Sequence, residues 1–384
     1  MKRVVVVGGG IAGASVAYEL AAEATVTVLE QEVTCGHHST GRSAAIFTEC
    51  YGDEVVRRLA IGSRRFLQDP PDGFTDAPLA TPRPLLFVGG PEDTTALDAA
   101  FVEFKALVPS IERLDATGCV KACPILRPDT VIGGVLEPNG ADLDVHALHA
   151  GFLGGIRRRG GRVHTGSPVV GLERRGEAWL ASTPSGVFEA DVVVDAAGAW
   201  ADRVGALAGA DPIGLTPMRR TAFTFPAPEG ASTSGWPMVI DVHHEQFYFR
   251  PEGRSQLLAS PCDQTPMEPH DVRHEELDVA LGIERIESVT TLRIRSVAHA
   301  WAGLRSFVAD HRPVNGWDPL LPGFYWLAGQ GGFGIKTSPA MARFAAGLIL
   351  RGTVPDDLTA IGLAVGDLSV TRPGLHDDIT SPSP

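Results

Sequence analysis

Three glycines near the start of the chain are spaced so that their backbone could hold the phosphates of a dinucleotide. Gly8, Gly10 and Gly13 form the pattern G-x-G-x-x-G, and Glu30 follows seventeen residues after Gly13. Such glycines allow a tight turn, a close approach of the backbone to a pyrophosphate, and close packing of a helix on a strand. An acid at about this distance accepts hydrogen bonds from ribose hydroxyls. The pattern predicts a site for FAD or NAD, because Glu30 favours a free 2′-hydroxyl over the phosphate of NADP.

The elements that must position this motif are a strand, a turn, a helix and a second strand. Residues 4–7 are four valines, residues 11–20 have the apolar spacing of a helix, and "ATVTVLE" alternates up to Glu30. Three consecutive glycines split the apolar run, which favours a strand and a turn over an export signal. The later apolar segments are too short to span a membrane. We therefore expect a cytoplasmic protein.

Length and charge limit the remaining possibilities. The 384 residues exceed one ordinary domain, so two domains are expected, in a monomer or a dimer. With 33 Lys and Arg residues against 46 Asp and Glu residues, the formal net charge is −13, which argues against binding to nucleic acid or anionic lipid. The five cysteines are scattered and odd in number, so a disulfide framework is not expected.

Two later segments favour FAD over NAD. "DAAGAW" closes an apolar strand, and the small residues Ala197 and Gly198 would let the end of that strand pass close to a cofactor. "GQGGFGIKTS" places four glycines between an aromatic strand and an amphipathic helix, whose N-terminus could lie under a flavin. A nicotinamide fold needs neither segment. One long cofactor is therefore expected to touch both ends of the chain.

The segments between these blocks have the character of a second domain. Runs rich in β-branched and aromatic residues at 83–90, 221–228, 246–260 and 290–297 predict antiparallel strands. The expected fold is α/β (α+β overall), with a Rossmann-like FAD-binding domain and an interleaved antiparallel-sheet substrate-binding domain. We assign residues 1–82, 142–212 and 300–370 to the FAD-binding domain, 83–141 and 213–299 to the substrate-binding domain, and 371–384 to a flexible tail.

These motifs together resemble the D-amino acid oxidase-like superfamily of FAD enzymes and, within it, the bacterial FAD-dependent D-arginine dehydrogenases. The likeness rests on "GGGIAGAS", "HSTGRSAA", "TPRP", "NGADLDVHALHAGFLGGIRRRGG", "DAAGAW", "WAGLRSFVAD" and "GQGGFGIKTS", which span nearly the whole chain. The resemblance implies a glutathione-reductase-type flavoprotein. Sarcosine oxidase-like relatives attach the flavin to a C-terminal cysteine, and no cysteine follows Cys262 here, so we expect noncovalent FAD. The resemblance also implies oxidative deamination of D-amino acids, in which a hydride passes from Cα to flavin N5 and water hydrolyses the imino acid to a 2-keto acid and ammonia.

The resemblance also implies the residues of the site. The substrate carboxylate would meet Tyr51, Tyr248, Arg220 and Arg305, and the amine would meet the backbone carbonyl of Gly332; Arg219 would be solvated. Lys336 resembles a sarcosine oxidase lysine that binds the substrate carboxylate. The substrate pocket would be lined by Ile46, Thr48, Leu85, Met238 and Ile240. The cofactor contacts would be Gly8, Gly10, Ile11, Ala12, Gly13, Glu30, Gln31, Ser39, Thr40, Arg42, Ser43, Ala44, Ala45, Val169, Ala197, Gly198, Trp200, Gly303, Gly331, Gly332, Gly334, Ile335, Lys336 and Thr337.

Three positions depart from the arginine-specific relative. Leu85 replaces a glutamate that pairs with the substrate guanidinium, so we expect a preference for neutral or hydrophobic side chains over basic ones. Ile46 replaces a histidine linked to the protonation state of the amine, and Lys336 replaces a glutamine. The lysine leaves oxidation of glycine or of sarcosine-like secondary amines as an alternative.

Other functions remain as alternatives. The first motif alone allows an NAD-linked dehydrogenase, and a flavin-binding module without turnover would also carry all these segments. A metal site is not expected, because the adjacent His37 and His38 should point apart and have no acidic partner at ligand spacing. The partner would be a small-molecule substrate, an amino acid, and the electron acceptor would be oxygen, a quinone or another redox partner.

Overall fold

A parallel β-sheet forms around the N-terminal valine run. In the computed structural model, which describes residues 1–243 and 246–377, this sheet has six strands in the order β20-β21-β13-β1-β2-β9. Neighbouring strands are parallel except at the β20 edge. The strands are β1 (Arg3–Val7), β2 (Thr25–Leu29), β9 (Arg162–His164), β13 (Val192–Asp195), β20 (Val314–Trp317) and β21 (Phe324–Ala328). The continuous valine run suits a central strand, because both faces of such a sheet are buried.

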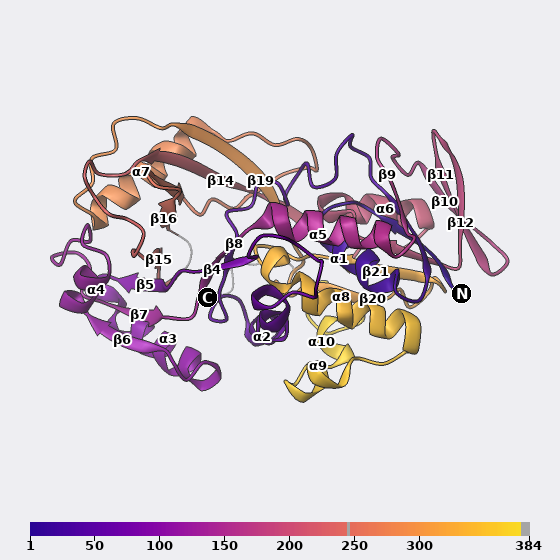
Figure 1. Cartoon of the computed structure of the whole chain (residues 1–384), viewed down its shortest axis with the longest axis horizontal. Coiled ribbons are helices and arrows are strands. Elements are labelled where there is room, and N and C mark those ends of the chain that lie inside the picture. The colour runs from indigo at the N-terminus through magenta and orange to yellow at the C-terminus, as the bar shows by residue number, and fades with distance from the viewer. Residues whose placement is uncertain (244–245, 378–384) are drawn as a thin grey trace.

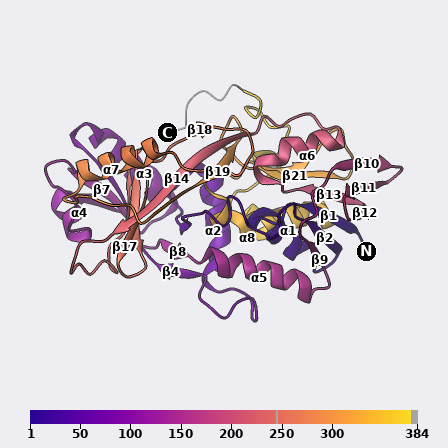
Figure 2. The same cartoon turned by 90° about the horizontal axis from the view of Figure 1, so that it is seen from above.

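The two faces of this sheet have separate cores. Val4 and Val6 pack against α1 (Ile11–Leu20), α5 (Val145–Arg158) and α8 (Gly334–Arg351). Val5 and Val7 face the opposite side, towards α6 (Ala201–Ala208) and the meander of β10 (Gly171–Arg175), β11 (Ala178–Thr183) and β12 (Gly186–Ala190). Helices α1 and α8 lie side by side in both views (Figures 1 and 2), with α2 (Glu54–Gln68) against α8. The short helices α9 (Asp356–Ala360) and α10 (Val365–Leu368) follow α8.

A second, mostly antiparallel sheet occupies the other end of the molecule (Figure 1). Its order is β18-β14-β17-β16-β15-β5-β7-β6, and β19 pairs with β14. The strands are β5 (Leu85–Gly89), β6 (Glu112–Asp115), β7 (Gly133–Glu137), β14 (Thr216–Pro226), β15 (Met238–Asp241), β16 (Tyr248–Glu252), β17 (Gln256–Ser260), β18 (Thr265–Pro266) and β19 (His299–Phe307). Only β5 and β15 pair in parallel among these described strands. Helices α3 (Thr94–Leu107), α4 (Ala116–Ala122) and α7 (Glu276–Val289) cover the sheet.

Three short strands form a small sheet of their own. Each of them lies in the chain between a strand of one large sheet and a strand of the other. The small sheet contains β3 (Ile46–Phe47), β4 (Ala80–Pro82) and β8 (Ala141–Leu143), with β8 in the centre. Two single-turn 3₁₀ helices, η1 (Pro91–Asp93) and η2 (Gly198–Trp200), complete the elements. The mixed α/β architecture is the fold class predicted from the sequence.

The structure differs from the sequence expectations in three places. Strand β19 pairs along its length with β14, so by hydrogen bonding it belongs to the second sheet, whereas the predicted boundary put residues 300–370 with the cofactor domain. Residues 290–297 form no strand beyond an isolated bridge from Thr290 to Leu126. Within the predicted tail 371–384, residues 378–384 lie outside the described residues, but Arg372 and Leu375 are buried, so the start of that segment is anchored.

Among the helices that the structure describes, none combines the length and the apolar character that a membrane crossing requires.

Candidate functional site

The turn between β1 and α1 has no room for side chains at its glycines. Gly8 has a φ of +104°, and a Cβ there would lie 2.5 Å from the carbonyl oxygen of Ala196. A Cβ on Gly13 would lie 1.8 Å from the carbonyl oxygen of Gly8. The first turn of α1 is held from outside the helix, because the Ile11 N–H donates to Thr40 Oγ1 over 2.9 Å. The start of α1 is thus fixed, and the backbone N–H groups that follow Ile11 in the first turn remain available to an anion.

The carboxylate at the end of β2 is fixed by backbone donors. Glu30 Oε2 accepts the Gly9 N–H over 2.7 Å, and Oε1 accepts the Glu32 N–H over 2.8 Å. On the other side of the turn, His149 Nε2 lies 2.8 Å from the Gly9 carbonyl oxygen. Burial lowers the pKa of His149, so a neutral imidazole donates this bond. The sequence did not indicate that His149 contacts this turn, because its partner Gly9 lies 140 residues away in the chain.

A second helix start adjoins the first. The segment after β21 turns through Gly329 and Gly331, whose φ angles are +66° and +48°, and α8 begins at Gly334. A Cβ on Gly334 would lie 3.8 Å from Ile11 Cγ2, so the N-termini of α1 and α8 are neighbours. Each helix N-terminus carries a partial positive charge, and together they favour a ligand with negative groups.

A cavity of about 370 Å³ runs between these helix starts and β19. The residues predicted for the cofactor that line it are Gly8, Gly10, Ile11, Ala12, Glu30, Gln31, Ser39, Thr40, Arg42, Ser43, Ala44, Val169, Ala197, Gly198, Trp200, Gly303, Gly331, Gly332, Gly334 and Ile335. Its wall also includes His37, His38, Gln330 and Ser306, which were not among the predicted cofactor contacts. The cavity joins the glycine turn, the acid and both helix starts, so its donor set fits FAD.

Four residues predicted for the cofactor lie elsewhere. Ala45 and Lys336 line a second cavity instead. Gly13 and Thr337 are absent from both walls. Gly13 packs on the Gly8 carbonyl, and the Thr337 hydroxyl donates to the carbonyl oxygen of Phe333 within α8. These last two residues therefore shape the two helix starts.

The second cavity is smaller, about 60 Å³, and adjoins the first. Its lining includes all five residues predicted for the substrate pocket, namely Ile46, Thr48, Leu85, Met238 and Ile240, together with Tyr51 and Lys336. The paired strands β5 and β15 supply the apolar wall, because Leu85 is in register with Met238. The sequence did not indicate Phe87 and Cys262, which also line it.

Two arginines and a tyrosine lie where the two cavities meet. Arg220, Arg305 and Tyr248 line both cavities, as does Gly332. Arg305 Nη1 is buried and has no hydrogen-bond partner among the described residues. Burial raises the pKa of Tyr248, which keeps its phenol protonated and able to donate. An unpaired buried guanidinium nitrogen beside a cavity suits an anionic ligand such as a carboxylate.

Arg219 does not share this wall, because successive residues of β14 point to opposite faces of the sheet. Its guanidinium pairs with Glu275 and, over 2.8 Å, with Asp278 Oδ2, and its side chain is only 4% exposed. The expectation that Arg219 is solvated was therefore wrong. Asp278 in α7 and Glu275 just before it supply the negative charge that compensates for the burial of the guanidinium.

A buried polar cluster lies behind the second cavity. Lys336, in the first turn of α8, is 3% exposed, and its Nζ donates to the carbonyl oxygens of Thr48 (3.0 Å) and Tyr51 (2.6 Å). The Thr48 hydroxyl donates to Glu137 Oε2 over 2.5 Å, and the Glu49 N–H donates to Glu137 Oε1 over 2.9 Å. Burial lowers the pKa of Lys336 to about 7 and raises that of Glu137. Glu137 carried no sequence signal.

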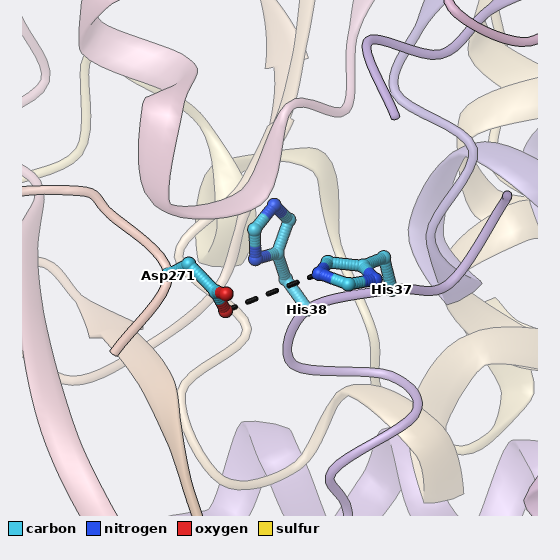
Figure 3. Close-up of side chains that lie close together, drawn as sticks. All are labelled: His37, His38 and Asp271. Carbon is cyan, nitrogen blue, oxygen red and sulfur yellow. Dashed lines mark ion pairs between the residues drawn. The ribbon is translucent and has the colours of Figure 1, made fainter. Parts of the chain in front are cut away.

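The paired histidines lie at the rim of the large cavity, close to an acid that the sequence had not indicated. His37 Nε2 is 3.9 Å from Asp271 Oδ1, and one ligand atom from each of His37, His38 and Asp271 lies within 4.8 Å of the others (Figure 3). The expectation that no acidic partner is near was wrong. Asp271 is also paired with Arg42, and His38 Nε2 lies 3.0 Å from Glu32 Oε1. The arginine cation on the same carboxylate favours an ion-pair network at this rim.

Comparison with known proteins supports this cofactor. Residues 3–348 match the family model for FAD dependent oxidoreductases called DAO. Glycine oxidase of Bacillus subtilis is 25% identical over 93% of this chain and 96% of its own length. The mitochondrial dimethylglycine dehydrogenase of Rattus norvegicus is 24% identical over 92% of this chain. The crystal structure of glycine oxidase from Geobacillus kaustophilus superposes with a TM-score of 0.85 at 22% identity, covering 97% of this chain and 99% of that one.

The chain spans only part of some relatives. It covers 43% of the length of the rat dehydrogenase, and 36% of a Bos taurus FAD-dependent oxidoreductase domain-containing protein 1 that is 31% identical over 43% of this chain. None of these four proteins is a D-arginine dehydrogenase. The specific likeness to that group, expected from the sequence, is therefore not supported by them, whereas the broader family likeness is.

Proposed function

Because the chain belongs to the DAO family of FAD-dependent oxidoreductases, we propose that it oxidises the amine-bearing carbon of a small amino acid with a neutral side chain. D-amino acids, glycine and N-methyl amino acids are the candidate substrates. FAD held in the large cavity would supply the acceptor for a hydride from the C–H bond. The neutral amine would be left as a protonated imine, which water hydrolyses. An NAD-linked dehydrogenase no longer stands as an alternative, because the family uses FAD.

The wall shared by the two cavities carries this proposal. Arg220 and Arg305 line both cavities, and Arg305 Nη1 is buried without a partner among the described residues. A carboxylate at this position would accept hydrogen bonds from a planar guanidinium and from the Tyr248 phenol. The substrate Cα would then lie at the junction with the cofactor cavity. This convergence favours an enzyme over a flavin-binding module without turnover.

The second cavity supports a small, neutral side chain. Its volume is about 60 Å³, and Leu85, Met238 and Ile240 form its apolar part. No Asp or Glu is among the described residues that line it, so a basic side chain would be buried without a counter-charge. Two observations favour glycine or sarcosine as the second candidate: the small volume, and the glycine oxidase and dimethylglycine dehydrogenase among the relatives.

Anaerobic mixing of the flavin-loaded protein with single amino acids tests the proposal. We expect bleaching of the flavin absorbance with glycine, sarcosine or D-alanine, and much slower bleaching with D-arginine and D-lysine. Readmission of oxygen, or of a quinone, then identifies the acceptor that restores the absorbance. If the protein binds FAD but none of these amino acids bleaches it, the proposed function is wrong.

Enlarging the apolar wall should shift the preference towards larger side chains. Leu85→Ala removes a side chain that is 1% exposed and lines the second cavity. We expect kcat/KM for D-leucine relative to D-alanine to rise about tenfold, since each methylene in an apolar pocket is worth about 1–3 kcal/mol. The same truncation at the neighbouring Leu86 is the control, because Leu86 is 0% exposed and lines neither cavity. An equal shift in both variants would contradict a specific role for Leu85.

A further inference from the structure

We propose that the Lys336 amine takes the proton from the substrate ammonium. Glu137, which is linked to Lys336 by Thr48, controls how readily the amine accepts that proton. This inference rests on the proposed oxidation of an amino acid. It assigns Lys336 a different task from the expected one, which was to bind the substrate carboxylate as a cation.

The hydrogen bonds of Lys336 suit a neutral amine. Its Nζ donates to the carbonyl oxygens of Thr48 and Tyr51, over 3.0 and 2.6 Å. A neutral amine has two N–H groups and one lone pair, so these two bonds use both donors. Lys336 also lines the second cavity, and the proposed proton transfer uses the remaining position on Nζ. A fixed amine beside the reacting group is the arrangement that general base catalysis requires.

Thr48 joins Lys336 to Glu137. The Thr48 carbonyl accepts from Lys336, while its hydroxyl donates to Glu137 Oε2 over 2.5 Å. Glu137 is 0% exposed and accepts a second bond from the Glu49 N–H. The carboxylate is thus fixed close to the lysine, and its charge stabilises the ammonium that forms when Lys336 gains a proton.

The other groups around Lys336 do not take the place of Glu137 as its negatively charged neighbour. Glu49 forms an ion pair with Arg64, and Arg57 forms one with Glu103. Cys50 is buried, which raises the pKa of its thiol and keeps it uncharged. Tyr51 also lines the second cavity, and its ring centre lies 5.4 Å from Lys336 Nζ. Burial lowers the pKa of Lys336 to about 7, against the opposing effect of Glu137, so the neutral amine is available near neutral pH.

Four other ionisable side chains that line the second cavity are poorer proton acceptors than a neutral amine. The guanidinium groups of Arg220 and Arg305 offer donors and no acceptor atom, and burial raises the pKa of Tyr248 and of Cys262, which keeps both protonated. Ile46, which also lines this cavity, has no ionisable group. Lys336 therefore offers a base at this cavity.

The step is a simple proton transfer. An N–H bond of the substrate ammonium breaks and a bond from that hydrogen to Lys336 Nζ forms, so the substrate becomes a neutral amine and the lysine an ammonium. Nothing is oxidised or reduced in this step. The free lone pair on the substrate nitrogen is needed before the neighbouring carbon can lose its hydrogen with two electrons.

The pH dependence of anaerobic flavin reduction separates a base from a carboxylate anchor. With an amino acid from the panel that bleaches the flavin, we expect the wild-type rate at limiting substrate to fall below about pH 7. Lys336→Met should lower this rate at least about a hundredfold, within the range for loss of a general base. Lys336→Arg keeps the cation but cannot release its proton, so it should be as slow as Lys336→Met while still binding acetate. Wild-type rates and pH dependence in Lys336→Arg would overturn the proposal.

Glu137 is tested as a positioning residue by the same profile. Glu137→Gln removes the negative charge that favours protonated Lys336, so the acid limb of the profile should move to lower pH. An unchanged limb would contradict the link through Thr48. Lys121→Met, at an exposed lysine, is the matched control and should leave rate and profile unchanged.

Thermal melts test the protonation of Lys336 without any substrate. The unfolded chain holds a lysine proton up to about pH 10.4, whereas the folded protein loses it near pH 7. Folding therefore releases a proton between these values, and the stability of the folded state rises with pH through that window. Glu137→Gln should melt below Glu137→Gln/Lys336→Met at pH 6–7, and the gap should close towards pH 10. Both proteins carry the Glu137→Gln change, so no carboxylate titrates at that position in either of them.

The two kinds of result distinguish the two proposals. If no amino acid bleaches the flavin but the melting gap closes with rising pH, the proposed function fails while the neutral lysine stands. If the gap does not change with pH, Lys336 is an ordinary cation and the inference fails, whatever the substrate.

Discussion

Replacing Arg305 by methionine is expected to lower kcat/KM for every amino acid substrate by between about 30-fold and a few thousand-fold, since truncating one partner of a buried charge pair costs about 2–5 kcal/mol. The measurement is the rate of anaerobic flavin reduction against substrate concentration. Affinity for acetate, read from the flavin absorbance, should fall with it, because acetate offers the carboxylate without the amine.

The geometry of β14 and β19 is the reason for this effect. Arg305 lies on β19 in register with Met218, and Arg220 lies two residues further along β14. Both guanidiniums thus reach the junction of the two cavities from adjacent strands. Arg220 is held from behind, because its Nε donates to the Asp263 carbonyl over 2.8 Å. Arg305 Nη1 has no such partner among the described residues, so a bound carboxylate would give it one.

Arg305 also makes close contact with the turn before α8. A Cβ on Gly332 would lie 2.8 Å from Arg305 Nη1, so the guanidinium packs directly on that backbone. Arg295→Met is the control, because Arg295 is exposed in the segment before β19. If Arg305→Met lowered the melting temperature but left the affinity for acetate unchanged, the arginine would be structural and the carboxylate would bind elsewhere.

The position of the cavity that fits FAD could be predicted from the sequence because its determinants are local. The G-x-G-x-x-G turn, the acid at the end of β2 and the glycines before α8 each act within a short segment, and parallel strands bring their carboxyl ends to one edge of the sheet. The predicted meeting of both chain ends is consistent with Gly334 lying beside Ile11.

The buried cluster could not be predicted in this way. Glu137 is the last residue of β7, and nothing in "GGVLEPNG" distinguishes it from an exposed strand end. Its burial follows from the pairing of β7 with β5, and its partner Thr48 is 89 residues away. Arg219 was misjudged for the same reason, since its acidic partners are more than fifty residues along the chain. Long-range pairings of this kind have no local pattern.

Replacing Gly13 by alanine is expected to abolish FAD binding. The added Cβ would lie 1.8 Å from the Gly8 carbonyl oxygen, well inside van der Waals contact. Gly8 cannot move aside freely, because its N–H donates to the Leu29 carbonyl oxygen over 2.8 Å. The turn must open and α1 must shift from β1, at a cost of about 4 kcal/mol or more. The ratio of flavin to protein absorbance after purification measures the loss, which should exceed about a hundredfold in affinity.

Gly366→Ala makes the same chemical change where the Cβ meets nothing within 4 Å, so its flavin content and stability should match those of the wild type. Gly13 lines neither cavity, and its effect on FAD is therefore expected to act through the turn. The flavin-free Gly13→Ala protein should for that reason melt at a lower temperature than flavin-free wild type. Loss of FAD with unchanged stability of the flavin-free protein would instead mean that Gly13 contacts the cofactor directly and that the β1–α1 turn tolerates a side chain.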